Sequence, residues 1–235
     1  MILRGYSNLT GVLGLKSGLH IGTGADPGKG QPLPIMVSPR SGQPYVPGSS
    51  LKGKMRCLLE LTYDRPRTDP RDPGSPCQCG VCQICLLFGS GSAATTREPT
   101  RLIFRDCFLT TPSTELLEKI QLEEKPGVRI DRVTGKAAKG ALFPMERVPE
   151  GCEFKLEISV RLFENDEADA VRKWLAMGLF LMEKDALGGG GTRGSGYIEF
   201  NKIQFDEKAF VDKWRDECEK TKDSLKKEVQ IKKKS

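Results

Sequence analysis

Four cysteines crowd into the nine-residue string CQCGVCQIC. They are Cys77, Cys79, Cys82 and Cys85, and a turn-forming glycine lies between the second and the third. Four thiolates satisfy the tetrahedral coordination of Zn²⁺, and the glycine lets closely spaced ligands fold around one ion. We therefore expect a structural zinc site with no open position for activating water. The spacing is tighter than in a usual two-knuckle finger, so unligated or redox-active cysteines are the alternative.

Glycines dominate a second string, GGGGTRGSG, at residues 188–196. Glycine adopts positive φ angles and carries no side chain, so backbone amides here can approach a phosphate or a sugar closely, with Arg193 supplying charge. The string precedes a strand instead of joining a strand to a helix, which argues against a nucleotide-cofactor site. A flexible connector is the alternative.

A third string, VPGSSLKGKMRCLLE, places a basic cluster at a predicted helix start. Ser49 or Ser50 is expected to cap this helix, whose free amides and positive dipole favour an anion. Lys52, Lys54 and Arg56 add positive charge nearby. A solvated basic face is the alternative for these side chains.

His20 is the only histidine of the chain. Cleavage of RNA by a pair of histidines is therefore excluded within one chain. His20 lies between Gly18 and Gly22, so a packing or turn role competes with any functional role.

Hydrophobic periodicity predicts the elements that must position these residues. Strands are expected at 8–16, 101–110, 152–163 and 197–205, and helices at about 49–63, 113–120 and 166–187. Without the short helix 113–120, the order strand, helix, strand, strand, helix, strand is the ferredoxin-like pattern.

Three further segments are set apart by composition. Residues 64–100 are rich in Pro, Asp, Gly, Ser and Cys and cannot supply a hydrophobic core. We interpret them as an insertion that must be stabilised in another way. Residues 125–151 combine basic residues with turn formers and are expected to form an extended hairpin or arm. We predict one domain over residues 1–205, followed by a charged helix and basic tail over 206–235.

The composition narrows the function classes only modestly. Lys plus Arg number 37 against 31 Asp plus Glu, and the net charge of +6 mildly favours an acidic partner. Aromatic residues make up 7% of the chain, so gripping a nucleic-acid backbone is favoured over stacking of bases on exposed aromatic platforms. Neither a membrane-spanning stretch nor a secretory signal is recognisable, and we expect a cytoplasmic protein.

Several of these strings occur together in an order typical of one family. LHIGTG, PYVPGSSLKGKMRCLLE, RLIFRDCFL, IDRVTGKA with ERVPEGCEF, and GGGGTRGSGYIEF follow one another between about residues 9 and 205. In this the chain resembles the RAMP superfamily, specifically the repeated backbone subunits of prokaryotic type III CRISPR effector complexes. The resemblance implies an α+β, modified ferredoxin-like fold, similar to an RNA-recognition motif, with a palm, a thumb hairpin at 125–151 and a zinc-binding insertion.

The resemblance also implies partners and contacts. Such subunits line up head to tail on a CRISPR guide RNA, beside paralogous subunits and a large signature subunit, and hold the guide with its complementary target RNA for antiviral defence. The implied RNA-binding residues are His20, Ser49, Ser50, Lys52, Lys54, Arg56, Arg129, Arg132, Gly189, Gly190, Gly191 and Arg193. Many weak phosphate contacts suit a subunit that must accept any guide. The chain resembles the small repeated backbone subunit of subtype A. The cysteine cluster of this chain, however, is similar to the clusters in the backbone proteins of subtypes D and E.

The resemblance leaves catalysis open. Family members that cut target RNA resemble one another in an aspartate just before a hydrophobic residue and a proline, and here Pro32 holds that place in Pro32-Leu33-Pro34. The nearest carboxylate is Asp26, which could orient Mg²⁺ or an attacking 2′-hydroxyl, or could simply form a turn. The alternatives are therefore a subunit that only binds RNA, a metal-dependent endoribonuclease, and a zinc-containing interaction module without RNA.

Overall fold

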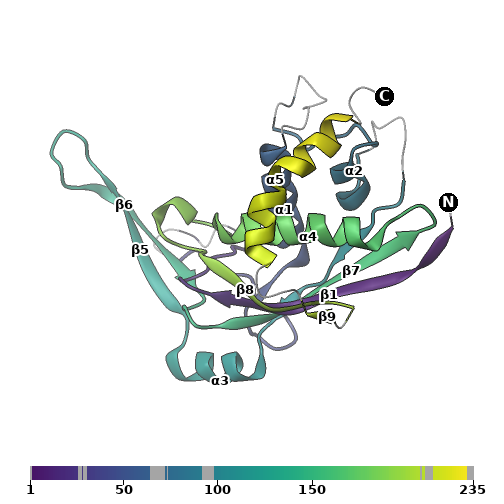
Figure 1. Cartoon of the computed structure of the whole chain (residues 1–235). Coiled ribbons are helices and arrows are strands. Elements are labelled where there is room, and N and C mark those ends of the chain that lie inside the picture. The colour runs from purple at the N-terminus through teal and green to yellow at the C-terminus, as the bar shows by residue number, and fades with distance from the viewer. Residues whose placement is uncertain are drawn as a thin grey trace.

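The computed structural model describes residues 2–25, 28, 31–63, 72, 74–91, 98–206, 208–209 and 214–231. A five-stranded antiparallel sheet in the order β3-β7-β1-β8-β9 forms its centre (Figure 1). The strands of this sheet are β1 (Leu3–Leu15), β3 (Leu102–Phe104), β7 (Glu153–Phe163), β8 (Ile198–Phe205) and β9 (Lys208–Ala209).

Two long helices connect these strands in the expected order. Helix α1 (Gly48–Thr62) follows β1, and helix α4 (Ala168–Glu183) joins β7 to β8. Both helices lie on the same face of the sheet (Figure 1). Together with the strand order, this arrangement confirms the ferredoxin-like α+β fold expected from the sequence. We call the five-stranded sheet with α1 and α4 the palm.

Strand β1 owes its place in the sheet to alternating burial. Leu9 and Leu13 are fully buried beneath the helices, whereas Asn8 and Thr10 are exposed on the other face. The strand starts at Leu3, earlier than the predicted 8–16, because its first residues pair with the end of β7. That pairing joins residues far apart in the chain and leaves no local signal.

The core fills the space between the sheet and the helices. Phe154 and Phe200 from the sheet are fully buried with Trp174 from α4. Helices α1 and α4 approach closely at Gly178, where an added Cβ would lie 2.6 Å from Cγ of Met55. Close packing at this crossing therefore depends on a glycine.

The predicted strand 101–110 is divided between two sheets. Its first part is β3, whereas β4 (Cys107–Phe108) pairs with β2 (Tyr45–Val46) in a separate small sheet. Helix α3 (Thr111–Ile120) follows and lies on the side of the sheet away from α1 (Figure 1).

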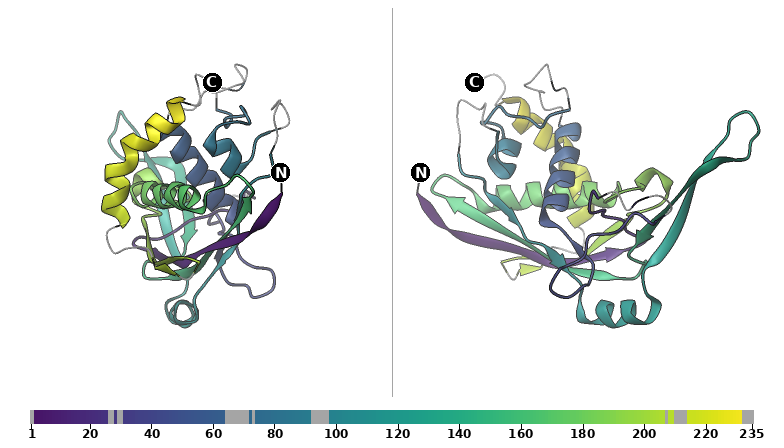
Figure 2. Two further views of the ribbon diagram at one scale, coloured as in Figure 1. Left: turned by 45° about the vertical axis from the view of Figure 1, so that its right-hand side comes forward. Right: turned by 180° about the vertical axis from the view of Figure 1, so that it is seen from behind.

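A hairpin projects from one end of the molecule. Its strands are β5 (Glu123–Ile130) and β6 (Ala137–Arg147), and it stands clear of the sheet in opposite views (Figures 1 and 2). We call this hairpin, residues 123–147, the thumb. It overlaps the arm that the sequence predicted at 125–151, and it begins two residues and ends four residues earlier.

Segment 64–100 was expected to be unable to supply a hydrophobic core, but its described part adds buried apolar side chains to the core of the domain. Helix α2 (Gln83–Phe88) buries Ile84, Leu87 and Phe88 in the core. Phe88 also stacks on Phe104 of β3, with ring centroids 5.9 Å apart. Three apolar side chains on a short helix therefore fasten this segment to the domain.

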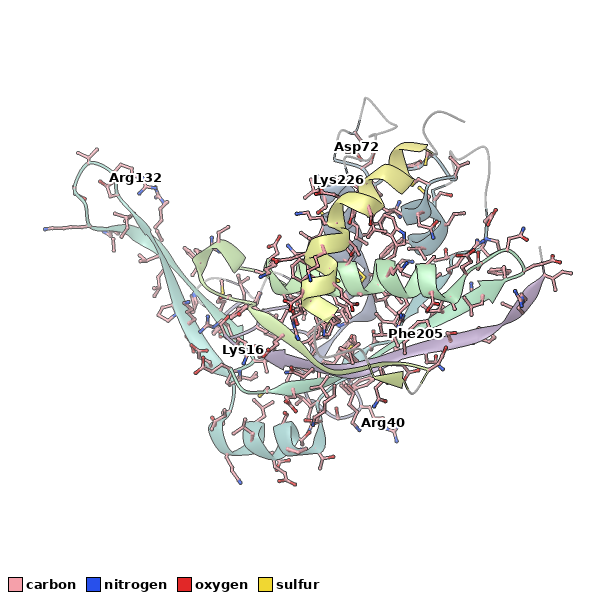
Figure 3. The ribbon with its side chains drawn as sticks, in the orientation of Figure 1. Lys16, Arg40, Asp72, Arg132, Phe205 and Lys226 are labelled. Atoms are coloured by element: carbon pink, nitrogen blue, oxygen red, sulfur yellow. The ribbon has the colours of Figure 1, made fainter. Side chains whose placement is uncertain are left out.

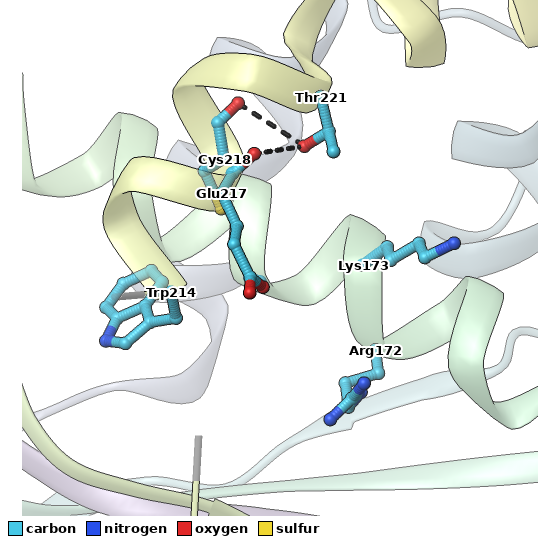
Figure 4. A pocket seen from close by; sticks show the side chains of 7 residues that line it. Arg172, Lys173, Trp214, Glu217, Cys218 and Thr221 are labelled. Carbon is cyan, nitrogen blue, oxygen red and sulfur yellow. Dashed lines mark hydrogen bonds between the residues drawn. The ribbon is translucent and has the colours of Figure 1, made fainter. Parts of the chain in front are cut away.

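Helix α5 (Trp214–Ile231) packs against α4, and its buried residues are Trp214, Cys218 and Leu225. Burial raises the pKa of the Cys218 thiol to about 12, so this thiol stays protonated. A small hollow remains between the two helices, beside Arg172 and Thr221 (Figure 4).

The domain boundary at residue 205 stays a prediction. Within the described ranges, no helix is long and apolar enough to cross a membrane.

Candidate nucleic-acid interface and metal centre

The four clustered cysteines converge on one point. Their sulfur atoms all lie within 4.8 Å of one another, and Sγ of Cys79 is 3.9 Å from Sγ of Cys85. An ion held tetrahedrally by sulfur at about 2.3 Å would set these separations at roughly 3.8 Å. The cluster is therefore able to hold a metal ion, and its geometry fits a tetrahedral one.

Crowding changes the acidity of these thiols. Hydrogen bonds with Cys77 and Cys85 hold the pKa of Cys82 well below its usual value, and hydrogen bonds with Cys82 and Cys85 raise the pKa of Cys77. One thiolate is thus stabilised by protonated neighbours. A bound divalent cation would stabilise the thiolate form of the others as well.

Arg56 ties helix α1 to the cysteine segment. Its two terminal nitrogens donate to the carbonyls of Gly89 (2.9 Å) and Cys77 (2.6 Å), and its Nε donates to Glu60 (2.8 Å). The Glu60 carboxylate also accepts from the amide of Cys77 (3.1 Å). A guanidinium held in this way would have to break these bonds to reach a phosphate.

The serine cap expected for α1 is wrong. The helix starts at Gly48 with Pro47 at its N-cap, and no side chain of the cap residue bonds the first turn. Instead, Oδ1 of Asp106 accepts from the amide of Gly48 at 2.8 Å. Proline offers no side-chain acceptor, so a carboxylate 58 residues later supplies one. Ser49 is left exposed, and Ser50 is half-buried.

The lysines of α1 lie beside an open stretch of the helix. Burial, followed by the charge of Arg56, lowers the pKa of the half-buried Lys52. Nζ of Lys54 lies 3.2 Å from Oδ1 of Asp185, just after α4. Between the two lysines, Gly53 is exposed, and an added Cβ there would meet nothing within 4 Å.

The glycine-rich string, which we call the glycine loop (residues 188–196), is packed instead of being a flexible connector. Gly188 has φ +76°, and an added Cβ would lie 2.2 Å from the carbonyl oxygen of His20. The amide of Gly189 donates to that same carbonyl at 2.8 Å. Gly191 to Arg193 then form one 3₁₀ turn that leaves Arg193 exposed.

His20 joins the glycine loop to the thumb. It is 8% exposed, and its Nδ1 lies 2.7 Å from the backbone carbonyl of Glu146. Because a carbonyl only accepts, Nδ1 carries a proton and donates it to this carbonyl. A positioning role therefore fits His20 better than direct contact with a ligand.

The thumb exposes charge and apolar surface. Arg129 and Arg132 are exposed, Arg132 at the tip (Figure 3). Val128 and Leu142 face each other across the hairpin, and both side chains are exposed. The thumb thus offers cations for phosphates and an apolar surface for nucleobases.

The segment that holds the family's apparent catalytic position runs beside the thumb. The amide of Leu33 donates to the carbonyl of Pro144 (3.0 Å), and the carbonyl of Leu33 accepts from the amide of Glu146 (3.0 Å). Pro32, next to it, carries no carboxylate. Asp26, the candidate catalytic residue, lies outside the described residues.

The glycine loop and the thumb meet at one end of the sheet through His20 and Glu146. Helix α1 is joined by the ion pair of Lys54 to Asp185, three residues before the glycine loop begins. The sequence singled out Lys54 and His20, but not their carboxylate and carbonyl partners, which are distant in the chain. The cysteine cluster lies at the other half of α1, joined to it by Arg56.

Residues 13–199, most of the chain, match the sequence pattern of the family described as the RAMP superfamily. The chain belongs to this superfamily, and the resemblance noted in its motifs is confirmed. The match spans the palm, the cysteine cluster, the thumb and the glycine loop.

Individual relatives narrow the comparison. The protein named "CRISPR system Cms endoribonuclease Csm3" of Methanothermobacter thermautotrophicus is 40% identical over 221 residues, covering 85% of each chain. The protein of the same name from Methanocaldococcus jannaschii is 36% identical over 206 residues, covering 87% of this chain and 82% of its own. A chain in the crystal structure of the Csm3-Csm4 subcomplex of the type III-A CRISPR-Cas interference complex is similar in fold. The TM-score is 0.57 at 27% identity, over 98% of each chain.

Proposed function

We propose that this chain is a guide-RNA-binding backbone subunit of a type III CRISPR interference complex in the prokaryotic cytoplasm. The observation that carries the proposal is the contact of the glycine loop with the thumb in a RAMP-family fold, with α1 paired to the residue Asp185 that leads into this loop. The partners are the guide RNA, its complementary target RNA, neighbouring copies or paralogous RAMP subunits, and a large signature subunit.

Each element has a distinct task in this proposal. Ser49 and Lys52 face the sugar-phosphate strand at α1, where Gly53 permits close approach. Lys54 contacts the same strand by exchanging its ion pair with Asp185 for a phosphate. Gly189, Gly190, Gly191 and Arg193 bring backbone and charge to the same strand. Arg129 and Arg132 contact phosphates along the thumb. We assign Arg56, Ser50 and His20 to positioning, since Arg56 and His20 are engaged within the protein and Ser50 is half-buried.

Charge reversal tests the assignment. Lys52→Glu places a negative charge beside the guide and should weaken guide RNA binding by at least about tenfold, since a phosphate contact becomes a repulsion. Lys119→Glu makes the same change on exposed α3, across the sheet, and should leave affinity unchanged. Fluorescence anisotropy of labelled guide RNA measures both. Equal affinities for the two variants would refute the proposal and favour an interaction module without RNA.

We also propose that Cys77, Cys79, Cys82 and Cys85 hold a structural zinc ion. The convergence of four sulfurs with tetrahedral spacing supports this proposal, and thiolate ligands favour zinc over harder cations. With four protein ligands, the ion would fix the fold of the segment and would take no part in cutting RNA.

A second candidate function is cutting of target RNA by this subunit. The relatives are named endoribonucleases, which favours the idea. With Pro32 at the family's apparent aspartate position, Asp26 would have to orient Mg²⁺ or the attacking 2′-hydroxyl. The test incubates the assembled complex with complementary RNA and Mg²⁺, and compares Asp26→Ala with the parent. Loss of a specific product supports cutting through Asp26, and unchanged cutting assigns the chemistry elsewhere.

A further inference from the structure

Arg147, the last residue of β6, is a buried cation at the root of the thumb. It lies opposite Glu123, the first residue of β5, and is 7% exposed. One terminal nitrogen donates to the Glu123 carboxylate, and the other donates to Oγ of Ser195 at 3.0 Å. Ser195 is itself buried in the glycine loop. A single guanidinium therefore joins both strands of the thumb to this loop.

Gly18, just after β1, packs directly against the guanidinium group of Arg147. An added Cβ at Gly18 would lie 2.6 Å from Nε and 2.7 Å from Cζ of Arg147. The carbonyl of Gly18 accepts from the amide of Gly196, at the end of the glycine loop, at 2.9 Å. The palm, the thumb and the loop are thus in contact around Arg147.

The preceding residue of the thumb makes a parallel connection. The carbonyl of Glu146 lies 2.7 Å from Nδ1 of His20, and the carbonyl of His20 accepts from the amide of Gly189 at 2.8 Å. Two consecutive residues of β6 are therefore linked to the glycine loop along separate paths. Beyond this root the hairpin projects from the sheet (Figure 1), so its direction is set here.

Stability alone does not explain a charge at this place. Nε of Arg147 is buried and has no hydrogen-bond acceptor among the described residues. A buried donor without a partner is costly, and a buried ion pair replaced as a whole by apolar residues often leaves stability unchanged or raises it. Orientation is the use of such groups that fits a residue shared by two elements.

We propose that Arg147 is a positioning residue that holds the thumb and the glycine loop at one fixed angle. The two elements then act on the guide and its paired target as one rigid unit, so no binding energy is lost in ordering them. The inference rests on the proposed function, because it takes these elements to be the RNA-facing ones.

The test measures thumb orientation directly in the full-length chain. Spin labels on non-natural amino acids, which avoid the native cysteines, are placed at Thr10 on the palm and at Val133, which is 94% exposed on the thumb. Double electron–electron resonance should give a narrow distance distribution in the parent and a broad one in Arg147→Leu, measured at a temperature at which the variant is folded, because the loss of one buried partner lowers its melting temperature. Guide RNA affinity of the unlabelled variant should fall about tenfold.

Two variants sharpen the result. Arg147→Lys keeps the charge but cannot bridge two acceptors with one planar group, so it should restore part of the affinity and narrow the distribution. Ser195→Ala removes only the loop half of the link and should broaden the distribution less, which keeps the test decisive if the leucine variant does not fold. Arg105→Leu makes the matched change at an exposed arginine beside β3 and should alter nothing.

A narrow distribution in both Arg147→Leu and Ser195→Ala would overturn the inference, as would a broad distribution with unchanged guide affinity. A melting temperature lowered in step with affinity, with distances unaltered, would assign Arg147 to stability alone. Unchanged affinity in Lys52→Glu would refute the proposed function instead, whatever the label distances show.

Discussion

Gly194 and Gly196 separate two reasons for a glycine within one loop. Their φ angles are +81° and +76°, so both are left-handed. An added Cβ at Gly194 meets nothing within 4 Å, whereas at Gly196 it would lie 1.9 Å from the carbonyl oxygen of Leu187. Position 194 thus requires glycine only because of its left-handed backbone angle. Position 196 requires glycine for the same reason and also because a Cβ would clash with the backbone of Leu187.

Alanine substitution should resolve the difference. Gly194→Ala should lower the free energy of unfolding by about 1–2 kcal/mol, the cost of a left-handed residue with a Cβ. Gly196→Ala should cost at least about 3 kcal/mol, because a backbone clash is added to the same angular strain. Equilibrium urea denaturation measures both. Equal losses would contradict a packed glycine loop.

Asp131 organises the tip of the thumb. Its Oδ1 accepts hydrogen bonds from the amide of Thr134 (2.8 Å), from the Thr134 hydroxyl (3.0 Å) and from the amide of Val133 (3.0 Å). These bonds, the Thr134 amide first, hold the pKa of the Asp131 carboxyl below its usual value. The ionised form therefore stabilises the turn.

The lowered pKa fixes the pH at which this turn weakens. A carboxyl with a depressed pKa stabilises the turn at pH above its ordinary value of 3.8, and this contribution is lost as the pH falls through the lower pKa of the folded state. Nuclear magnetic resonance of the Val133 and Thr134 amides should show the turn opening only below pH 3.8, and Asp131→Ala should show it open at neutral pH. A turn that stays closed in Asp131→Ala would contradict this account.

At the scale of single residues, the sequence was better at indicating which side chains matter than at indicating which groups they bind. The spacing of the cysteines sufficed to predict their convergence, because all four lie within one short string. The serine cap failed because Asp106, distant in the chain, takes its place. Arg56 had a visible local signal in Glu60 four residues later, but its carbonyl acceptors at Cys77 and Gly89 depend on the tertiary fold.

At the scale of elements, the cysteine segment should depend on its metal. Cys77→Ser combined with Cys79→Ser removes two of four ligands and should abolish a content of about one zinc ion per chain. The melting temperature should fall by several degrees, since the segment that contains α2 would lose the metal and would be held by its buried apolar side chains alone. Elemental analysis and calorimetry measure the two effects.

Cys57→Ser provides the control for that experiment. Cys57 is an exposed cysteine of α1 that is not part of the cluster, so its replacement should change neither metal content nor melting temperature. An unchanged metal content in the double variant would end the zinc proposal.

Elements with a strong local period were predictable, and those defined by distant pairing were not. Helices α1 and α4 follow from apolar residues on one helical face. The early start of β1 and the division between β3 and β4 depend on β7 and β2, which no local pattern reveals. Helix α2 was missed because its six residues are too few to establish a period.

At the scale of the whole molecule, charge is distributed and not concentrated. A net charge of +6 arises from 37 basic and 31 acidic residues, and several cations of α1 and the thumb root are paired with carboxylates. Under the proposed function, RNA binding would depend on a limited set of cations that have no carboxylate partner. Within the described part of the chain, the exposed Arg129 and Arg132 on the thumb meet this condition.

The number of contacts between the protein and RNA phosphates can be estimated from how the affinity for guide RNA changes with salt concentration. For single-stranded nucleic acid, each neutralised phosphate contributes about −0.7 to the slope of log affinity against log salt concentration. Arg129→Ala and Arg132→Ala should therefore each make the slope less steep by about 0.7. Lys119→Ala, on the opposite side of the sheet, should leave it unchanged. The parent slope should persist across guides of different sequence, because phosphate contacts carry no base information. If neither arginine substitution changed the slope, the proposal that the thumb contacts RNA phosphates would be wrong.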